Sequence, residues 1–350
     1  MAVYTTIDDP SAYFQTTLYT GNGSTNAITN SGNSDLQPDW VWIKKRSATE
    51  NHALYDSVRG TTKTLYSNLN EAEYTEATSL TAFGSDGFTL GADGIVNANT
   101  GTYVSWNWKM GTTSGITTGG ASVTPSGYSF SATAGQSVIT WTGTGSNLTV
   151  PHGLGTALGT MFVKCRSHTG DWVFFHKTMG GAYGMELPST SAKQNTTAWF
   201  NSTAPDADKF TIGTNGNVNT SGRSYVAYCF ADVQGYSKFG SYTGNGNVSG
   251  TFIYTGHKSS YLMIKRTDSD GQWRIWDNKR NTFNPANTNL QANENGADYT
   301  DNAVAVDFLA NGIKTRNTEA EINASGGTYV YMSFAENPFV TSTGVPTTAR

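Results

Sequence analysis

One short motif occurs three times in the chain, and it constrains the fold more than any other feature. An aromatic residue is followed by Thr-Gly, then Asn or Thr, then Gly, at Tyr19–Gly23, Trp141–Gly145 and Tyr242–Gly246. An aromatic residue that leads into two closely spaced glycines is typical of a β-strand ending in a tight turn. The recurrence indicates an internal repeat, which has to be considered before any other assignment.

Two further motifs recur with nearly the same spacing. An apolar stretch ends in lysine at Lys44, Lys164 and Lys265, and a Tyr-Val pair follows a glycine at Tyr103, Tyr225 and Tyr329. The Thr-Gly motif advances by 122 and then 101 residues, the lysine by 120 and 101, and the Tyr-Val pair by 122 and 104. Three unrelated motifs with one shared spacing predict three tandem copies of a module of roughly 100 residues.

The copies also set the expected domain limits. We expect an N-terminal arm at 1–12, modules at 13–111, 128–234 and 235–339, and a C-terminal tail at 340–350. The stretch 112–127 is rich in Gly, Ser and Thr and is predicted to be a linker, which accounts for the longer first spacing. Arms of this kind commonly become ordered by packing on a neighbouring subunit.

Composition favours strands over helices. Charged residues make up 14% of the chain, compared with about 25% in ordinary soluble proteins, and aromatic residues at 12% supply large apolar side chains for a core. Residues 103–108 alternate large with small or polar side chains, as a half-buried strand does. We therefore predict an all-β protein of three tandem antiparallel β-sandwich repeats, similar to a jelly roll or a concanavalin-like sandwich.

Several classes of function are disfavoured by charge and hydropathy. The net charge is −4 without a basic cluster, which argues against nucleic-acid binding. No stretch approaches the ~20 apolar residues of a membrane helix, and the first residues do not resemble a signal peptide, so we expect folding in a cytosol. Cys165 and Cys229 are predicted to be buried free thiols, with a disulfide left open if their strands face each other.

A lysine and an acid recur at a fixed offset. Asp56 follows Lys44 by twelve residues and Asp277 follows Lys265 by twelve, whereas the middle copy has His176 at this place. Burying the charged amino group of a lysine in an apolar strand costs free energy unless an opposite charge lies close to it. We therefore predict Lys44–Asp56 and Lys265–Asp277 ion pairs across a hairpin. The alternative is that these lysines extend to solvent from sheet edges.

The sequence lacks the motifs of common catalytic sites. There is no hydrolase elbow, phosphate-binding loop or paired metal-ligand motif. Acids at 71–76 have a spacing similar to that of sandwich-fold glucanases but are predicted to form a solvated loop, and 268–271 is predicted to be a polar turn rather than a calcium loop. Trp273 and Trp276 are weak candidates for stacking on a sugar, with core positions as the alternative. We predict no catalytic residue, metal or cofactor.

The longer motifs resemble a known group of proteins. They occur at Tyr19–Gly23, Pro38–Lys44, Asp56–Gly60, Gly235–Gly246, Met263–Asp268, Trp276–Asn281 and Ala335–Phe339. Together they make essentially the whole chain resemble a family of uncharacterised virion-associated proteins of tailed phages, especially marine phages. The middle repeat departs from the pattern at His176.

The resemblance implies lectin-like sandwiches and no catalytic residues. It implies a non-enzymatic structural protein of a phage virion, folded in the host cytoplasm, most simply a tail fibre or spike. Such a protein is expected to be a homotrimer that contacts other virion proteins and attaches to host-surface glycans. The alternatives are a capsid decoration or head-fibre protein and, less favoured, a polysaccharide-degrading enzyme.

Overall fold

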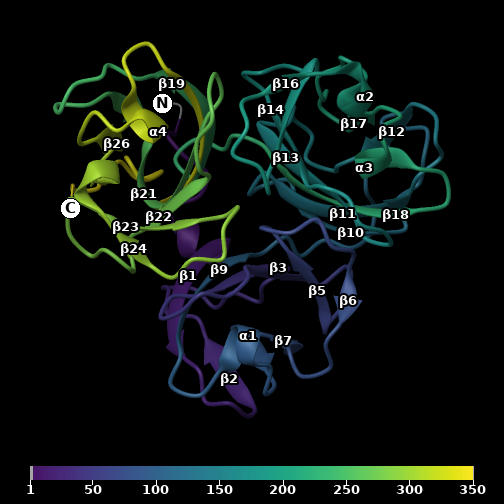
Figure 1. The fold of residues 1–350 in the computed structure, drawn as a ribbon, viewed down its shortest axis with the longest axis horizontal. Helices are drawn as coiled ribbons and strands as arrows, with labels where there is room; N and C mark the ends of the chain where they lie inside the picture. Colours follow the sequence, from purple (N-terminus) through teal and green to yellow (C-terminus); the bar gives the residue numbers. More distant parts are fainter. Residues whose placement is uncertain (1–2, 350) are drawn as a thin grey trace.

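The computed structural model describes residues 3–349, which form three lobes around a common centre (Figure 1). Strands dominate, their pairings are antiparallel, and every helix in this range has only three or four residues. The predicted all-β class with antiparallel sheets is confirmed. The helices are η1 (Pro10–Ala12), α1 (Gly94–Asn97), α2 (Thr197–Phe200), α3 (Gly216–Asn219), η2 (Asn302–Val304) and α4 (Ala320–Asn323). None of those within residues 3–349 has the length and apolar character that crossing a membrane requires.

The first unit has a large sheet in the order β1-β9-β3-β4-β5-β6 and a small sheet in the order β2-β8-β7. Its strands are β1 (Phe14–Thr20), β2 (Asn26–Thr29), β3 (Trp40–Lys45), β4 (Ala53–Asp56), β5 (Lys63–Tyr66), β6 (Tyr74–Thr75), β7 (Leu80–Gly84), β8 (Gly87–Leu90) and β9 (Thr102–Trp108). The central strand β3 is apolar on consecutive positions because both faces of the large sheet are covered.

The second unit has a large sheet in the order β10-β11-β18-β13-β14-β15-β16 and a small sheet of β12 and β17. Its strands are β10 (Gly127–Ser131), β11 (Gln136–Thr142), β12 (Leu148–Pro151), β13 (Thr160–Cys165), β14 (Val173–His176), β15 (Tyr183–Glu186), β16 (Gln194–Asn195), β17 (Lys209–Ile212) and β18 (Ser224–Phe230). The added strand β10 pairs with β11 at the edge of the large sheet.

The third unit has a large sheet in the order β19-β27-β21-β22-β23-β24 and a small sheet in the order β20-β26-β25. Its strands are β19 (Ser237–Thr243), β20 (Phe252–Tyr254), β21 (His257–Arg266), β22 (Arg274–Asp277), β23 (Thr288–Gln291), β24 (Tyr299–Thr300), β25 (Val306–Leu309), β26 (Gly312–Thr315) and β27 (Thr328–Pro338). Apart from β10, one strand order therefore occurs in all three large sheets.

Two of the recurring motifs meet at a one-turn helix in each unit. The helix ends in a buried asparagine whose side chain binds the backbone of the Thr-Gly loop. Asn97 accepts a hydrogen bond from the amide of Asn22 (3.0 Å) and donates to the carbonyls of Ser24 (2.6 Å) and Gly91 (2.7 Å). Asn219 and Asn323 make corresponding bonds in the other two units. In each unit, this asparagine therefore fixes the conformation of the Thr-Gly loop.

The tyrosine of the Tyr-Val motif holds the same helix from the sheet side. In the first unit the hydroxyl of Tyr103 accepts from the amide of Ala98 (2.8 Å) and donates to the carbonyl of Gly94 (3.1 Å). Tyr225 and Tyr329 bind their helices in the same way. A buried tyrosine hydroxyl needs such partners, and the one-turn helix supplies them in each of the three units.

The apolar core consists of one cluster inside each unit and one cluster shared by all three units. Each unit has an inner cluster of apolar side chains between its large and small sheets. A further cluster contains side chains from all three units and lies where the large sheets face one another. Each large sheet is thus covered by its own small sheet on one face and by the other two units on the opposite face.

The stretch 112–127 is packed onto the second unit and is not a free linker. The amide of Val123 donates to the carbonyl of Thr149 in β12 (3.3 Å), and the amide of Ser122 donates to the Thr149 hydroxyl (2.8 Å). Lys209 in β17 also donates to the carbonyl of Gly119 (2.6 Å). The segment covers an edge of the small sheet that in this unit has only two strands.

The terminal segments pack against the third unit of the same chain. Ile7 is buried in the shared core, and the hydroxyl of Tyr4 donates to the carbonyl of Gly256 in the third unit (2.7 Å). Asp8 accepts from the amide of Ser342 in the C-terminal tail (2.6 Å). The described parts of the two arms therefore bind each other and the third unit without a neighbouring subunit.

The prediction of two free, buried thiols is confirmed. Cys229 lies opposite Met161 in the β13–β18 ladder and Cys165 lies opposite Tyr225, so the two sulfur atoms are on adjacent strands but staggered by four residues. Burial raises the pKa of the Cys229 thiol. A thiol in this environment is unreactive.

We predict that Asn97→Ala destabilises the chain by about 2–4 kcal/mol, because it leaves several backbone groups of the Thr-Gly loop without partners. The free energy of unfolding, measured with urea, checks this. Asn99→Ala is the matched control, since Asn99 is exposed in the adjacent loop, and it should change the value by less than about 0.5 kcal/mol. Equal effects of the two substitutions would contradict the holding role of Asn97.

Candidate functional site: the interface between the three units

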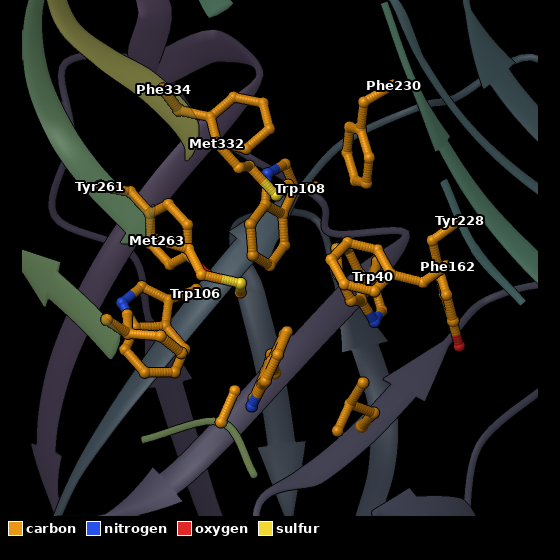
Figure 2. Packing of buried hydrophobic residues seen from close by; sticks show 14 of the residues in the cluster. Trp40, Trp106, Trp108, Phe162, Tyr228, Phe230, Tyr261, Met263, Met332 and Phe334 are labelled. Atoms are coloured by element: carbon orange, nitrogen blue, oxygen red, sulfur yellow. The ribbon is translucent and has the colours of Figure 1, made fainter. Parts of the chain in front are cut away.

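Aromatic side chains from three sheets meet at the centre of the molecule. The rings of Trp40 and Trp108 in the first unit stack at 4.2 Å between centroids, and Trp40 stacks on Tyr228 of the second unit at 4.4 Å. Phe14 stacks on Phe334 of the third unit at 5.1 Å. Figure 2 shows Trp40 and Trp108 between Tyr228 and Phe230 on one side and Phe334 and Tyr261 on the other. Large aromatic rings bury much apolar area each, so this contact binds the units strongly.

Trp273 and Trp276 are both buried, and the hypothesis that they stack on a sugar is wrong. Trp273 is 1% exposed and its indole N–H donates to the carbonyl of Ser189 in the second unit (3.0 Å). Trp276 is 0% exposed and lies in the inner core of the third unit. A ring with no accessible face cannot stack on a ligand, so the core alternative holds for both.

A chain of four charged residues connects the first unit to the second. Asp56 is bound by Arg59 three residues later, and both side chains are fully buried. Arg59 also contacts Glu73 (3.0 Å), which binds Arg166 of the second unit with both oxygens (each 2.9 Å). These arginines hold the pKa of Glu73 below its usual value against the effect of burial. Asp56 further accepts from the hydroxyl of Tyr228 (2.6 Å).

A matching chain connects the third unit to the first. Asp277 is bound by Arg280 at 2.6 Å, and Arg280 also contacts Asp298 at 3.1 Å. Asp298 in turn binds Arg46 of the first unit at 2.7 Å. Asp277 accepts from the indole N–H of Trp106 (3.2 Å) across the interface. The two networks have the same order of acid, arginine, acid and arginine.

The contact between the second and third units lacks this network. His176 occupies the position of the aspartate, and Met179 that of the arginine. The ring of His176 lies 3.4 Å from the carbonyl of Tyr331 in the third unit, and burial lowers its pKa to about 3. A neutral imidazole therefore takes the place of a buried ion pair in this interface.

The predicted Lys44–Asp56 and Lys265–Asp277 pairs are wrong. The hairpin register places Asp56 opposite Trp40 and Asp277 opposite Tyr261, so each aspartate lies four positions from its lysine along the neighbouring strand. The aspartates bind arginines instead. The alternative that the lysines extend to solvent also fails, because both are buried in central strands.

The three equivalent lysines bind backbone carbonyls. Lys164 donates to the carbonyl of Asn70 in the first unit (3.1 Å), and Lys265 donates to that of Thr190 in the second (2.9 Å). Lys44 donates to the carbonyl of its neighbour Lys45 (2.6 Å). Burial lowers the pKa of each of the three amino groups to about 8. Lys164 and Lys265 thus bind across the contacts between units, whereas Lys44 binds within its own unit.

Backbone hydrogen bonds close the three units into a ring. The amide of Glu73 donates to the carbonyl of Arg166 (2.8 Å), that of Lys193 to Thr267 (3.0 Å), and that of Asp298 to Arg46 (2.9 Å). Each bond joins the loop around the outermost strand of one large sheet to the end of a central strand in the next unit. The first unit contacts the second, the second contacts the third, and the third contacts the first.

Three of the acids considered for chemistry, Glu73, Glu76 and Asp268, have structural partners. Glu73, predicted to be in a solvated loop, is instead held between two arginines. Glu76 binds the amide and hydroxyl of Thr78, and Asp268 binds Arg266 and the amide of Thr328. Within residues 3–349 no group of three or more His, Cys, Asp or Glu side chains is arranged to hold a metal ion. The contacts of Glu73 join two units, whereas those of Glu76 and Asp268 lie within one unit.

Residues 9–338 match a protein family that is described as a domain of unknown function, DUF7483. The chain belongs to this family. The match runs through all three units and both ionic networks. No curated protein matches the chain.

Sequence reasoning missed the residues that form the networks. Arg59 and Arg280 follow their aspartates by three residues, and this repeated Asp-x-x-Arg spacing was a signal that could have identified them. Glu73 and Asp298 had no such signal, because they lie far from their partners in sequence. Asn97 and its counterparts also recur at the common spacing and could have been found.

We predict that Asp56→Ala destabilises the chain by about 3–5 kcal/mol, because it leaves Arg59 buried without its main partner. The free energy of unfolding is measured by urea denaturation, followed through the fluorescence of the buried tryptophans. Asp35→Ala is the control, since Asp35 is exposed. A loss below about 1 kcal/mol would mean that the network contributes little to stability.

We predict that stability falls as the pH drops below about 6.5. Burial lowers the pKa of His176 and His257 to about 3 and that of His52 well below its usual value. The folded state then stays unprotonated while the unfolded chain takes up protons, at about 1.4 kcal/mol per pH unit for each histidine. The free energy of unfolding measured between pH 7 and 5 checks this.

The controls for the pH prediction are single substitutions. Between pH 6 and 5, the His176→Asn chain should take up about one proton fewer on unfolding than the unsubstituted chain does. His168→Gln, at an exposed histidine, is the matched control. If stability is flat from pH 7 to 5 in the unsubstituted chain, the histidines are not buried as neutral groups.

Proposed function

We propose that the chain is a non-enzymatic structural protein of a tailed-phage virion, built from three copies of one β-sandwich module closed around a shared core. The observation that carries this proposal is the use of the charged groups at the interface. Buried aspartate–arginine pairs within the first and third units continue through a second acid into half-buried ion pairs that join each of these units to the next. Acids and arginines that are paired with one another in this way stabilise the contact between units and are not available for catalysis.

The placement of the units favours a compact element over the shaft of a fibre. The three lobes lie around a centre rather than end to end (Figure 1). An arrangement of this kind suits the tip of a tail appendage or spike, where the outer loops of all three modules meet the surroundings. Attachment to host-surface glycans through these modules is part of the proposal, on the strength of the resemblance to phage virion proteins.

The compact arrangement also supports a second candidate, a capsid decoration or head-fibre protein. Such a protein would use the same rigid ring to reinforce the shell. In either case the proposed homotrimer would form through the outer faces, because the large-sheet faces are already buried within one chain. A polysaccharide-degrading role has less support, since Glu73, the most central of its candidate acids, is bound by two arginines.

Imaging of the phage particle tests the proposal. We expect an antibody against the chain, detected with gold on purified virions, to label the particles at a fixed location. Label at the tail tip favours the appendage, and label over the head favours the decoration protein. Virions that contain no copy of the chain by mass spectrometry would refute a structural role in the particle.

A further inference from the structure

Large apolar side chains that are exposed to solvent gather in the third unit and the C-terminal tail. Of the eight that are exposed within residues 3–349, six lie between residues 235 and 349, whereas the second unit has none of them. Scattered apolar side chains are ordinary on a protein surface, but neighbouring ones mark a binding site. Phe252 and Tyr254 are such neighbours, because both belong to the three-residue strand β20.

Phe252 and Tyr254 lie on the outer face of the small sheet of the third unit. Ile253, between them, is part of the inner core of this unit. Successive side chains of a strand point to opposite faces, so the two rings point away from the core, and they are 48% and 51% exposed. In Figure 1 this sheet, marked by β26, lies on the side of the third lobe away from the centre. The face is therefore on the outside of the ring of units.

The corresponding strands of the other two units have no aromatic residue on this face. The three strands are aligned by the residues that point into the inner cores, namely Ile28, Val150 and Ile253. This alignment places other residues where the two rings are, namely Ala27 and Thr29 in the first unit and Thr149 and Pro151 in the second. Since two copies of the fold form without an aromatic pair here, the fold does not require it, and the pair points to a role at the surface.

Both rings are held in place before any ligand binds. A Cβ at Gly312, opposite Tyr254 in β26, would lie 2.8 Å from the ring of Phe252, so this ring lies over the glycine. The hydroxyl of Tyr254 contacts that of Tyr4 in the N-terminal arm (3.2 Å), and Tyr4 donates to the carbonyl of Gly256 (2.7 Å). An aromatic surface that is ordered in advance reduces the entropy cost of binding.

Charged groups lie beside the rings on the same face. Lys314 is opposite Phe252 in the β20–β26 pair, and Asp307 is opposite Lys314 in the β25–β26 pair. Lys314 donates to the hydroxyl of Ser249 (3.1 Å), and Asp307 contacts Arg316 (3.3 Å). An ammonium group has three protons to donate and a carboxylate has about four lone-pair sites, so both half-buried side chains can bind further partners.

This combination fits a saccharide better than the surface of another protein. Two half-exposed rings present on the order of 200 Å² of apolar area, whereas a stable protein interface buries about 800 Å² on each partner. A pyranose has apolar C–H faces that stack on aromatic rings, and hydroxyl groups that both donate and accept. The rings would contact the C–H faces, and Lys314 and Asp307 would bind the hydroxyl groups.

We propose that the outer face of the small sheet of the third unit binds pyranose rings of a polysaccharide, with Phe252 and Tyr254 as the stacking residues. The biological meaning of this site rests on the attachment role proposed above. The third unit is then the part of the chain that contacts the host surface, because the other two units lack the aromatic pair.

Saturation-transfer NMR on the intact chain tests this with cellohexaose, laminarihexaose, mannohexaose and chitohexaose. We expect at least one of them to bind. Phe252→Ala and Tyr254→Ala should each weaken that binding about fivefold or more, as the loss of a central aromatic contact does. Because both side chains are half-exposed, each substitution should change the melting temperature by less than about 2 °C. A loss of binding then cannot be ascribed to unfolding.

Tyr299→Ala is the matched control. Tyr299 is also half-exposed (50%) and belongs to the third unit, but it lies in β24 of the large sheet, so its replacement should leave binding unchanged. If none of the hexaoses binds, or if the Phe252→Ala and Tyr299→Ala chains bind equally well, the face is not a saccharide site.

Sedimentation velocity distinguishes the saccharide from a second copy of the chain. We expect Phe252→Ala to leave the sedimentation coefficient unchanged. An oligomer that Phe252→Ala dissociates would mean that the face binds another copy, and the proposed saccharide site would be wrong. The location of the chain on the virion is tested separately and is unaffected by either result.

Discussion

The packing of three large sheets against one another is the interaction on which the rest of the structure depends. Each sheet presents a face of large apolar side chains that its own small sheet does not cover, and the other two units bury that face. Apolar burial contributes roughly 25 cal/mol per Å², so a lone unit would expose a costly surface. The closed ring and the burial of Ile7 of the N-terminal arm in the shared core follow from this requirement.

The charged groups act within that framework. Removing an arginine and an aspartate from water costs several kcal/mol per ion unless each has several partners. Asp56 and Asp277 satisfy this condition, because each binds an arginine of its own unit. Each also accepts a hydrogen bond from the next unit, Asp56 from the hydroxyl of Tyr228 and Asp277 from the indole N–H of Trp106. In the second unit, where His176 replaces the aspartate, burial keeps the imidazole neutral. The interface therefore tolerates a neutral polar group where no full network is present.

Local geometry was predicted well from the sequence, and long-range contacts were not. The Thr-Gly and Tyr-Val motifs correctly indicated strands and turns, because their hydrogen bonds are formed within one unit. The ion pairs were assigned wrongly because a constant offset of twelve residues does not determine the register of a hairpin. Asp56 lies opposite Trp40, not Lys44. Glu73 was interpreted as solvated because its arginine from the second unit is 93 residues away.

The sequence by itself determined the all-β class, the buried free cysteines and the recurrence of three motifs, because these depend on residue type and local spacing. Only the tertiary structure decided that the units close into a ring and that Trp40 and Trp108 stack at its centre. These features depend on which faces meet in space. Many sheet-to-sheet arrangements are compatible with the same alternation of residues, and the packing of specific side chains selects one of them.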